Sequence, residues 1–278
     1  MSFFLFIILT SRFWFYFSDL QDNIMNGQNK IHKAIGLILD MILPRKCAVC
    51  EENLRYFEQH ICTKCFADMP YTYYWKSSHN AMADKFNEKI QKHYYPDKGN
   101  IAPFPRKLPY SYAISLFFFN SEAMYRHIPY KIKYGGDIPL GLFFGKLLGE
   151  KILGYDALKD IDTVIPVPLH WTRKWKRGYN QAEIIARGIV SVTGTELCTS
   201  LLKRKHRTKT QTRLDIEGKS RNVKDAFTIT SSLSDRRHIL LVDDVFTTGA
   251  TLTACYTAIS KAGNNIRISI ATLAVVSN

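Results

Sequence analysis

The sequence lacks internal repeats, low-complexity segments and an unbroken apolar run of the roughly 20 residues that cross a bilayer. The first two absences exclude a repeat array and wholesale disorder, in agreement with a composition of 46% apolar and 22% charged residues. Acidic residues are also scarce, since 24 Asp and Glu stand against 38 Lys and Arg and give a formal net charge of +14. We therefore expect an acidic partner, such as nucleic acid, a phosphorylated metabolite or an anionic membrane surface.

The N-terminal segment is strongly apolar, yet it matches neither a membrane span nor a signal peptide. Arg12 interrupts it, and it shows neither an early positive charge nor a small-residue cleavage site. We expect Met25 to be the natural start and residues 1–24 to be a non-native or apolar leader. A membrane anchor and an ordinary helix packed on the domain are the alternatives. Since nothing else indicates secretion, we expect a cytoplasmic protein without an obligate membrane partner.

Two C-x-x-C pairs, "CAVC" and "CTKC", are separated by eleven residues and contain Cys47, Cys50, Cys62 and Cys65. Each pair places two thiolates on a tight turn, where they can share one tetrahedral metal ion. Disulfides are disfavoured because Cys198 and Cys255 would remain unpaired, and a redox C-x-x-C motif normally occurs once. We predict a structural zinc knuckle within residues 25–70. An iron–sulfur cluster is the rival interpretation, because thiolate ligands alone do not choose between the two.

The rest of the chain alternates between strand and helix patterns. Residues 31–43 have helical spacing, and 71–109 are expected to be a linker with one short helix near 81–91. Strands are predicted at 110–119, 162–168, 236–245 and 266–276, and helices at 137–153, 178–194 and 251–263. Uninterrupted aliphatic strands alternating with helices indicate an α/β domain over 110–278, with a parallel sheet covered on both faces. In such sheets ligands bind beyond the carboxyl ends of the strands.

Residues 239–252, "ILLVDDVFTTGATL", contain the most informative motif. Two adjacent carboxylates, Asp243 and Asp244, end an aliphatic run and precede a turn of small and hydroxylated residues that opens a helix. Carboxylates accept hydrogen bonds from vicinal hydroxyls, and a turn at a helix start presents N–H groups to an anion. The ligand should therefore carry both hydroxyls and phosphate.

This motif resembles the phosphoribosyl diphosphate motif of the type I phosphoribosyltransferases. The resemblance implies that Asp243 and Asp244 hold the ribose hydroxyls, with a catalytic role, and that the following turn binds the 5′-phosphate. That turn comprises Thr247, Thr248, Gly249, Ala250 and Thr251. It also implies Mg²⁺ as a cofactor bound with the diphosphate. The predicted fold is a type I phosphoribosyltransferase-like domain preceded by a small zinc knuckle.

Three further segments, "KIKYGGD" (131–137), "IPVPLHWTRKWKRGYNQAEIIA" (165–186) and "RKHRTKTQTRLDIEGKSRNVKDAF" (204–227), together with the four cysteines, resemble the ComF family. Members of this family are competence-associated, phosphoribosyltransferase-like proteins with an N-terminal four-cysteine zinc knuckle. The resemblance covers roughly residues 31–275, with the motifs in the family's order.

The basic segments suit a leaving pyrophosphate, which needs positively charged and N–H donors. Between residues 166 and 224 there are fourteen Lys and Arg against four Asp and Glu. We expect Arg173, Arg177, Gly178 and Asn180 to face the pyrophosphate or another polyanion. The resemblance further implies a mobile loop over the leaving group, for which 206–214 is the candidate, with Arg207, Lys209 and Arg213.

One residue departs from the related purine-salvage enzymes. Where those enzymes carry an Asp that acts as base toward the purine, this sequence has Thr247. A purine-salvage activity is therefore disfavoured, and the sequence does not identify the acceptor of the phosphoribosyl group. His170, beside the basic motif, is the best remaining candidate for a base.

Two functions follow from these patterns. The first is Mg²⁺-dependent binding of 5-phosphoribosyl 1-diphosphate, or a related phosphoribosyl compound, with transfer to an acceptor. The alternative is a non-catalytic competence protein that binds single-stranded DNA, or the uptake machinery, through its basic region. Trp171 and Trp175 could stack on bases there. Their spacing of four residues is also that of a helical core stripe, which is the favoured interpretation of these two side chains.

Overall fold

The computed structural model describes residues 44–94, 110–204, 226–263 and 265–276. Within the chain it separates two compact units. We call Met1–Met69 with Met124–Leu140 the cysteine unit, and Pro70–Ala123 with Gly141–Asn278 the sheet unit. The leader 1–24, the predicted helix at 31–43 and the candidate loop 206–214 lie outside the described residues. The domain boundaries predicted from the sequence stay predictions.

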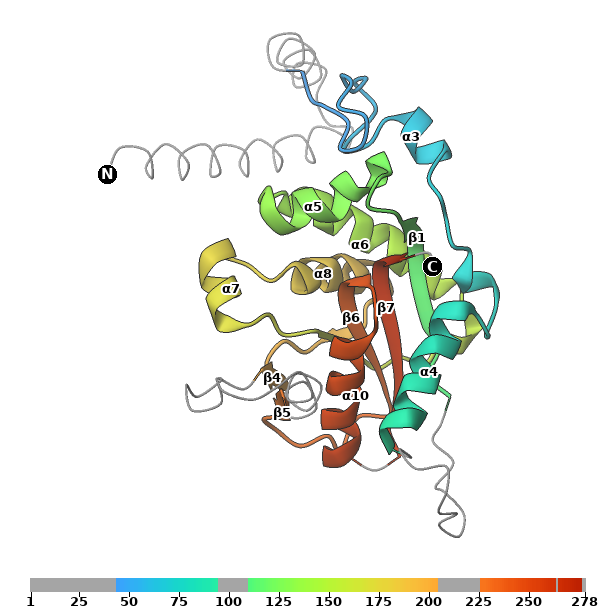
Figure 1. Cartoon of the computed structure of the whole chain (residues 1–278), viewed down its shortest axis with the longest axis vertical. Coiled ribbons are helices and arrows are strands. Elements are labelled where there is room, and N and C mark those ends of the chain that lie inside the picture. The colour runs from blue at the N-terminus through green and yellow to red at the C-terminus, as the bar shows by residue number, and fades with distance from the viewer. Residues whose placement is uncertain (1–43, 95–109, 205–225, 264, 277–278) are drawn as a thin grey trace, which may run out of the picture. The chain divides into compact units, whose positions relative to one another are not determined.

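The sheet unit is built on a five-stranded sheet with the order β1-β7-β6-β2-β3 (Figure 1). Every strand pair in it is parallel. The strands are β1 (Ala113–Phe119), β2 (Thr163–Pro166), β3 (Glu196–Leu197), β6 (His238–Phe246) and β7 (Arg267–Val276). The predicted α/β fold class with a parallel sheet is thereby confirmed, and the type I phosphoribosyltransferase-like domain is the fold it matches.

The helices of this unit cover both faces of the sheet. They are α4 (Ala81–Tyr94), α6 (Ile138–Leu153), α7 (Trp171–Arg177), α8 (Gln181–Thr193) and α10 (Ala250–Ala262), with short 3-10 turns η1 (Tyr74–Lys76) and η3 (Asp156–Leu158). The chain moves one way along the sheet from β2 through α8 to β3, and the other way from β6 through α10 to β7. Right-handed crossovers therefore place α8 and α10 on opposite faces.

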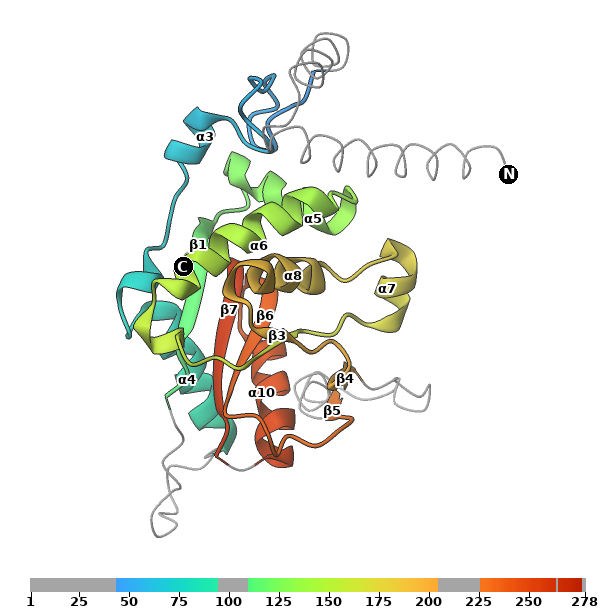
Figure 2. The ribbon, with the colours of Figure 1, turned by 180° about the vertical axis from the view of Figure 1, so that it is seen from behind.

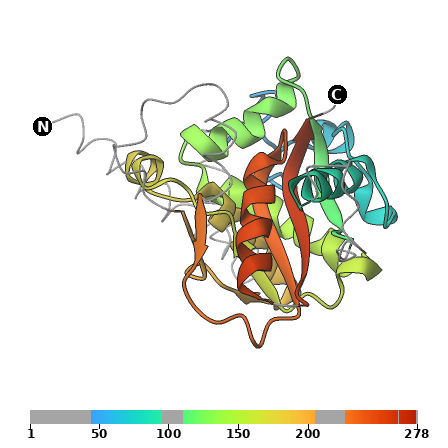
Figure 3. The ribbon, with the colours of Figure 1, turned by 60° about the horizontal axis from the view of Figure 1, so that its bottom comes forward.

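Helices α4 and α10 lie side by side on one face of the sheet (Figures 1 and 3). Phe86 of α4 is fully buried, and its ring meets Tyr256 of α10 edge to face with centroids 6.0 Å apart. Side chains at alternate positions of β6 and β7, including Ile239 and Ile268, belong to the same apolar cluster. This face of the sheet is therefore closed by a continuous hydrophobic core.

Helices α6 and α8 approach each other so closely that only glycine fits where they cross. A Cβ added to Gly188 would lie 2.5 Å from the carbonyl oxygen of Leu142 and 2.7 Å from Cα of Gly145. Seen from behind, the sheet stands in front of α10 (Figure 2). The crossover from β1 through α6 to β2 runs in the same direction as the one through α8, which puts both helices on this second face.

A second, two-stranded antiparallel sheet pairs β4 (Leu202–Arg204) with β5 (Phe227–Ile229). Arg204 is paired with Phe227, so the ladder brings the two ends of 205–225 together. At the outer edge of the large sheet, the N–H of Thr72 donates to Leu116 and the N–H of Phe118 donates to Pro70. Residues before α4 thus occupy hydrogen-bonding groups of β1 that would otherwise face outward.

The cysteine unit contains α3 (Thr63–Ala67), the 3-10 turn η2 (Met124–Arg126) and α5 (His127–Tyr134). Helix α5 was not predicted from the sequence. Pro129 lies in the first turn, in which its missing N–H would have had no intrahelical acceptor. None of the helices in the described ranges combines the length and the apolar character needed to cross a bilayer.

The favoured interpretation of the two tryptophans as core residues is wrong. Trp171 is 55% exposed and Trp175 is 87% exposed on α7. Helix α7 is only seven residues long and lies between β2 and α8 in the chain. The same spacing therefore produced an exposed aromatic pair, not a core stripe.

Candidate functional site

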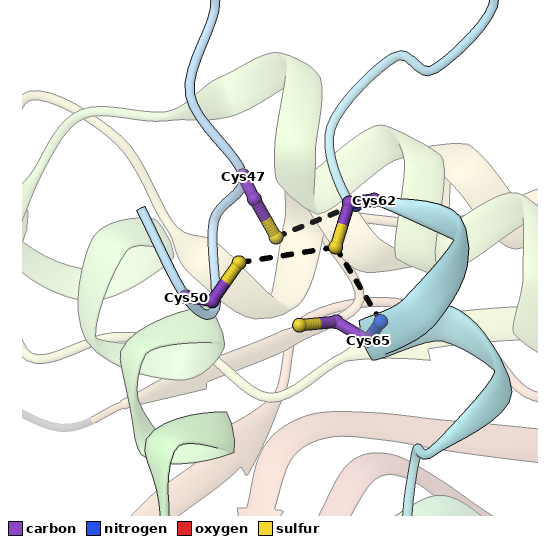
Figure 4. Close-up of side chains that lie close together, drawn as sticks. All are labelled: Cys47, Cys50, Cys62 and Cys65. Atoms are coloured by element: carbon purple, nitrogen blue, oxygen red, sulfur yellow. Dashed lines mark hydrogen bonds between the residues drawn. The ribbon is translucent and has the colours of Figure 1, made fainter. Parts of the chain in front are cut away.

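The four cysteines of the two C-x-x-C pairs converge in the cysteine unit, with their sulfur atoms pointing toward one another (Figure 4). All four Sγ atoms lie within 4.8 Å of one another, and the Sγ atoms of Cys50 and Cys62 are 3.8 Å apart. A tetrahedron with metal–sulfur bonds of about 2.3 Å requires sulfur–sulfur distances of about 3.8 Å. The donor set and its spacing therefore fit a single tetrahedral metal ion.

Backbone N–H groups point at these sulfur atoms. Cys47 Sγ accepts from the N–H of Cys62 at 3.3 Å and from the N–H of Val49 at 3.4 Å. Burial raises the pKa of the Cys47 thiol, but N–H donors outweigh burial and bring its pKa to about 7. Burial and the neighbouring sulfurs raise the pKa of Cys65. The cluster thus favours one thiolate by itself and needs a cation to hold four.

A second layer of contacts holds the two cysteine turns. The carboxylate of Glu58 accepts from the N–H of Thr63 at 2.6 Å and from the N–H of Arg55 at 2.7 Å, and these bonds lower its pKa. From the other segment of the unit, the hydroxyl of Tyr125 donates to the carbonyl of Cys65 at 2.9 Å. His127 Nδ1 lies 3.2 Å from the carbonyl of Val49. Both turns are therefore supported by neighbouring residues as well as by one another.

The second candidate site lies in the sheet unit, at the carboxyl ends of β6 and β2. These strands are neighbours in the sheet. After β2 the chain continues toward β3 at one edge, and after β6 it continues toward β7 on the other side, so the strand order reverses between them. Crevices at such points are the usual ligand sites of open α/β sheets. The connection after β2 is tied to β6, because the N–H of Val167 donates to the carbonyl of Val242 at 2.8 Å.

The acidic pair occupies the last third of β6. Neighbouring strand residues point to opposite faces, so the side chains of Asp243 and Asp244 diverge. Asp244 is 5% exposed and Asp243 is half-buried. The Oδ1 atom of Asp244 accepts from the N–H of Val245 at 2.8 Å, and that of Asp243 accepts from the N–H of Asp244 at 2.9 Å. Asp243 therefore offers the more accessible carboxylate of the two.

The turn after β6 has the conformation that the glycine makes possible. Gly249 adopts φ 74°, in the left-handed region, and precedes the first residue of α10. A Cβ there would lie 2.8 Å from Cζ of the buried Phe246. Thr247 and Thr248 are exposed and Thr251 is half-buried. The turn is thus glycine-specific and leads directly into a helix N-terminus, whose first N–H groups have no intrahelical acceptor.

The residues predicted to face pyrophosphate lie on the connection between β2 and α8. Arg173 is exposed on α7, Arg177 ends that helix, and Gly178 adopts φ 79°. Asn180 caps α8, since its Oδ1 accepts from the N–H of Ala182 at 3.2 Å and its Nδ2 donates to the carbonyl of Val167 at 3.0 Å. Its side chain therefore shapes the turn. The contacts of these residues with pyrophosphate stay a prediction, and Arg207, Lys209 and Arg213 lie outside the described residues.

One basic residue near this site was missed by the sequence motifs. A Cβ on Gly249 would lie 3.6 Å from Cδ of Lys89 in α4, so the stem of Lys89 lies over the turn. Lys89 belongs to no motif that includes the acidic pair, which is why sequence patterns did not connect it with this site.

Comparison with known proteins shows relatives over part of the chain. The chain is 36% identical over 108 residues to "Competence protein F" of Haemophilus influenzae, a match that covers 38% of this chain and 47% of that protein. It is 31% identical over 133 residues to "Competence protein ComFC" of Streptococcus pneumoniae, covering 48% and 56% respectively. It is 33% identical over 91 residues to "DNA utilization protein YhgH" of Escherichia coli (strain K12), covering 33% and 40%.

The chain therefore spans about half the length of the curated relatives it matches. No protein-family model matches it. The names of the relatives nevertheless agree with the family that the sequence motifs suggested, and the convergence of the four cysteines agrees with the knuckle expected at that family's N-terminus. The names of these relatives and the four-cysteine cluster support the assignment of this chain to the ComF family.

Proposed function

We propose that this protein binds 5-phosphoribosyl 1-diphosphate, or a closely related phosphoribosyl compound, at the carboxyl end of β6 and transfers the phosphoribosyl group to an acceptor. The observation that carries the proposal is the position of the acidic pair and the glycine turn. Asp243, Asp244 and the turn through Thr251 adjoin the reversal point between β6 and β2. Their chemistry suits one ligand that has hydroxyls at one end and phosphate at the other.

In this proposal the two carboxylates accept hydrogen bonds from the ribose hydroxyls, with Asp243 contributing more because it is less buried. The 5′-phosphate accepts hydrogen bonds from the N–H groups and hydroxyls of the turn. When bound with the diphosphate, Mg²⁺ supplies positive charge that compensates the leaving group, and the acidic pair provides the oxygen ligands that this ion prefers.

The transfer itself breaks the bond between C1 of ribose and the pyrophosphate oxygen, which leaves with the electron pair. A nucleophilic atom of the acceptor forms the new bond to C1 and gives up a proton. Asp243 and Asp244 would stabilise the positive charge on the sugar, and Arg173 and Arg177 the negative charge on pyrophosphate. Thr247 cannot act as the carboxylate base of purine-salvage enzymes, so a purine acceptor is disfavoured.

We further propose that Cys47, Cys50, Cys62 and Cys65 bind one structural zinc ion. The four positions are filled by protein thiols, which leaves no coordination site for a substrate. The fit of the sulfur spacing to a tetrahedron supports this proposal, and the rival cluster with iron and sulfide is distinguished by its visible absorbance.

A second candidate function is binding of single-stranded DNA in a competence-related role. The relatives are named for competence and DNA utilization, and the exposed pair Trp171 and Trp175 favours this function over the core role that the sequence suggested. Exposed aromatic rings beside Arg173 offer bases a stacking surface and phosphates a cation. This surface is distinct in sequence from the acidic pair, so one protein could serve both functions.

Calorimetric titration separates these functions. Wild type should bind phosphoribosyl diphosphate with Mg²⁺, and Asp243→Asn should weaken that binding by roughly ten- to a hundredfold because a charged hydrogen bond contributes about 1.5–3 kcal/mol. A variant with Arg173→Glu and Arg177→Glu should bind ribose 5-phosphate normally and lose affinity for the diphosphate. A double variant, Asp243→Asn with Asp244→Asn, that bound the donor as well as wild type would refute the phosphoribosyl proposal.

The DNA arm of the experiment uses a fluorescent single-stranded oligonucleotide at several salt concentrations. Trp175→Ala should weaken binding by roughly fivefold or more, since stacking contributes about 1–3 kcal/mol per base. Asp243→Asn serves as the matched control and should leave oligonucleotide affinity unchanged. Equal affinity of wild type and Trp175→Ala for the oligonucleotide would show that α7 is not part of a DNA-binding surface.

A further inference from the structure

The sequence motif explains how the turn after β6 could hold a phosphate, but it contains no positive charge. Between Val242 and Leu252 there are two carboxylates and no Lys or Arg. A phosphate monoester at neutral pH carries nearly two negative charges. Hydrogen bonds from N–H groups and threonine hydroxyls orient such a ligand, and a nearby cation would offset the repulsion from the acidic pair.

Helix α4 brings a cation to this turn from a distant part of the sequence. Cδ of Lys89 lies 3.6 Å from the position of a Cβ on Gly249, which is ordinary van der Waals contact. The ammonium group is two bonds farther along the side chain. Lys89 is half-buried, so its stem lies on protein while its charged end keeps access to solvent.

Lys89 differs from its neighbour Lys92 on the same helix. Lys92 pairs with Glu88 one turn earlier and is 70% exposed. Among the described residues no carboxylate forms an ion pair with Lys89. A half-buried ammonium beside a turn of N–H groups and hydroxyls supplies the positive charge that the motif itself lacks, and so favours an anion there.

The helix that carries Lys89 is firmly held. Asn80 caps its start, accepting from the N–H of Ala83 at 2.9 Å and donating to the carbonyl of Ala113 at 3.0 Å. Asn87 exchanges hydrogen bonds with Ser111, at 2.8 Å and 2.9 Å. These bonds join α4 to the residues around the start of β1. Lys89 therefore lies on a well-held helix, and little backbone conformational entropy is lost when a ligand binds.

From this geometry we propose that Lys89 is a binding residue for the phosphate monoester of the ligand and sets a preference for 5-phosphorylated over unphosphorylated ribose. The inference rests on the proposed function, because it assigns the phosphate of that ligand to the turn at Gly249. It adds a residue outside the motif, contributed by a helix more than a hundred positions earlier in the chain. It also predicts that Lys89 contacts the phosphate monoester of the ligand and not its pyrophosphate.

The test is calorimetric titration of the full chain with ribose 5-phosphate, ribose and inorganic pyrophosphate. Lys89→Met keeps the length and most of the apolar stem and removes the charge. It should lower the affinity for ribose 5-phosphate about tenfold, as expected for one charged hydrogen bond, and leave pyrophosphate binding unchanged. Lys89→Arg should retain most of the affinity. Lys92→Met is the matched control and should bind like wild type.

The outcomes separate this inference from the proposed function. If wild type binds ribose 5-phosphate and Lys89→Met binds it equally well, the role of Lys89 is overturned while the phosphoribosyl site stands. If Lys89→Met weakens pyrophosphate instead, Lys89 serves the leaving group and the assignment to the monoester is wrong. If wild type binds none of the three compounds and no phosphoribosyl diphosphate, the proposed function fails and this inference fails with it. Melting temperatures of all variants should match, which excludes misfolding as the cause.

Discussion

In the cysteine unit, buried thiols and backbone N–H donors occupy the centre, whereas in the sheet unit aliphatic and aromatic side chains do. Cys47, Ala48 and Val49 are buried and Cys50 is half-buried, so ionisable thiols take up much of this centre. The sheet unit instead buries unbroken runs such as 239–242. From this difference we expect the first unit to respond to removal of a cation and the second to disturbed packing, so different perturbations should unfold them.

Removal of metal should produce the largest difference between the two units. Zinc binding by small cysteine sites stabilises the folded state by about 10 kcal/mol, so a chelator should abolish order in 44–69 and spare the sheet. Hydrogen-exchange mass spectrometry with and without chelator would show fast exchange in 44–69 and slow exchange in 238–246. Elemental analysis should give close to one zinc per chain.

Cysteine variants sharpen the same contrast. Cys62→Ser should reproduce the effect of the chelator, while Cys198→Ser, outside the cluster, should not alter zinc content or exchange. A metal-free protein whose residues 44–69 exchange as slowly as in the purified protein would contradict the metal dependence of this unit.

A glycine substitution in the sheet unit should show dependence on packing. In Gly188→Ala the added Cβ would meet the backbone of α6 at Leu142 and Gly145, so the two helices must separate. We expect a loss of about 3 kcal/mol in the free energy of unfolding, at the upper end of overpacking costs. Urea unfolding followed by circular dichroism measures it.

The matched control is Gly154→Ala, where the nearest atoms to the added Cβ lie at 3.8 Å. This variant should be as stable as wild type or slightly more so, since alanine reduces the entropy of the unfolded chain. If both variants were equally stable, the close approach of α6 and α8 would have no energetic consequence.

Acidification should destabilise the sheet unit through His238. Burial lowers its pKa from 6.5 to about 4, and the carboxylate of Asp162 compensates only in part. Because the folded pKa lies below the unfolded one, the unfolded chain takes up the proton first as the pH falls. Stability is therefore fully present above about pH 6.5 and is lost progressively down to about pH 4.

Between pH 7 and pH 5 the expected loss is about 2 kcal/mol, and it should be absent in His238→Gln. The comparison uses urea midpoints of both proteins at the two pH values, so an overall destabilisation of the variant cancels. Greater stability of wild type at pH 5 would mean that the attraction of Asp160, 2.7 Å from Nδ1, outweighs burial.

The smallest effect is expected at the turn after β6. Thr248→Val keeps the shape of the side chain and removes a hydroxyl that lies 3.4 Å from the N–H of Ala250. Affinity for ribose 5-phosphate should fall about fivefold, corresponding to about 1 kcal/mol for a neutral hydrogen bond, with no change in the melting temperature. Thr230→Val makes the same change at the residue that directly follows β5 and is a suitable control.

The sequence was informative where local patterns and long-range packing agree. The aliphatic run 239–242 and the glycine at 263 predicted β6 and the end of α10 because a parallel sheet buries both faces of its strands. The spacing of the cysteines predicted their convergence. The exposure of Trp175 and the helix around Pro129 could not be predicted, because both depend on which neighbours the fold places beside them.

The candidate site was predictable only in part for the same reason. The acidic pair and the turn are contiguous, so a motif contains them. Lys89 reaches the turn from α4, and no spacing rule connects residues so far apart in the sequence. A single sequence shows the part of a site that lies on one loop, and the fold adds the residues contributed by other elements.

The hydrogen bonds between residues 70–72 and β1 have a practical consequence for handling the protein. An open sheet can recruit a strand from a second molecule through an unpaired edge, which is a common route to aggregation. Here one edge is occupied by the chain's own backbone at Thr72 and Phe118, and the other ends in β3, which is two residues long. Within the described residues the large sheet therefore presents little free edge, and strand-exchange aggregation should be slow even for variants with a weakened core.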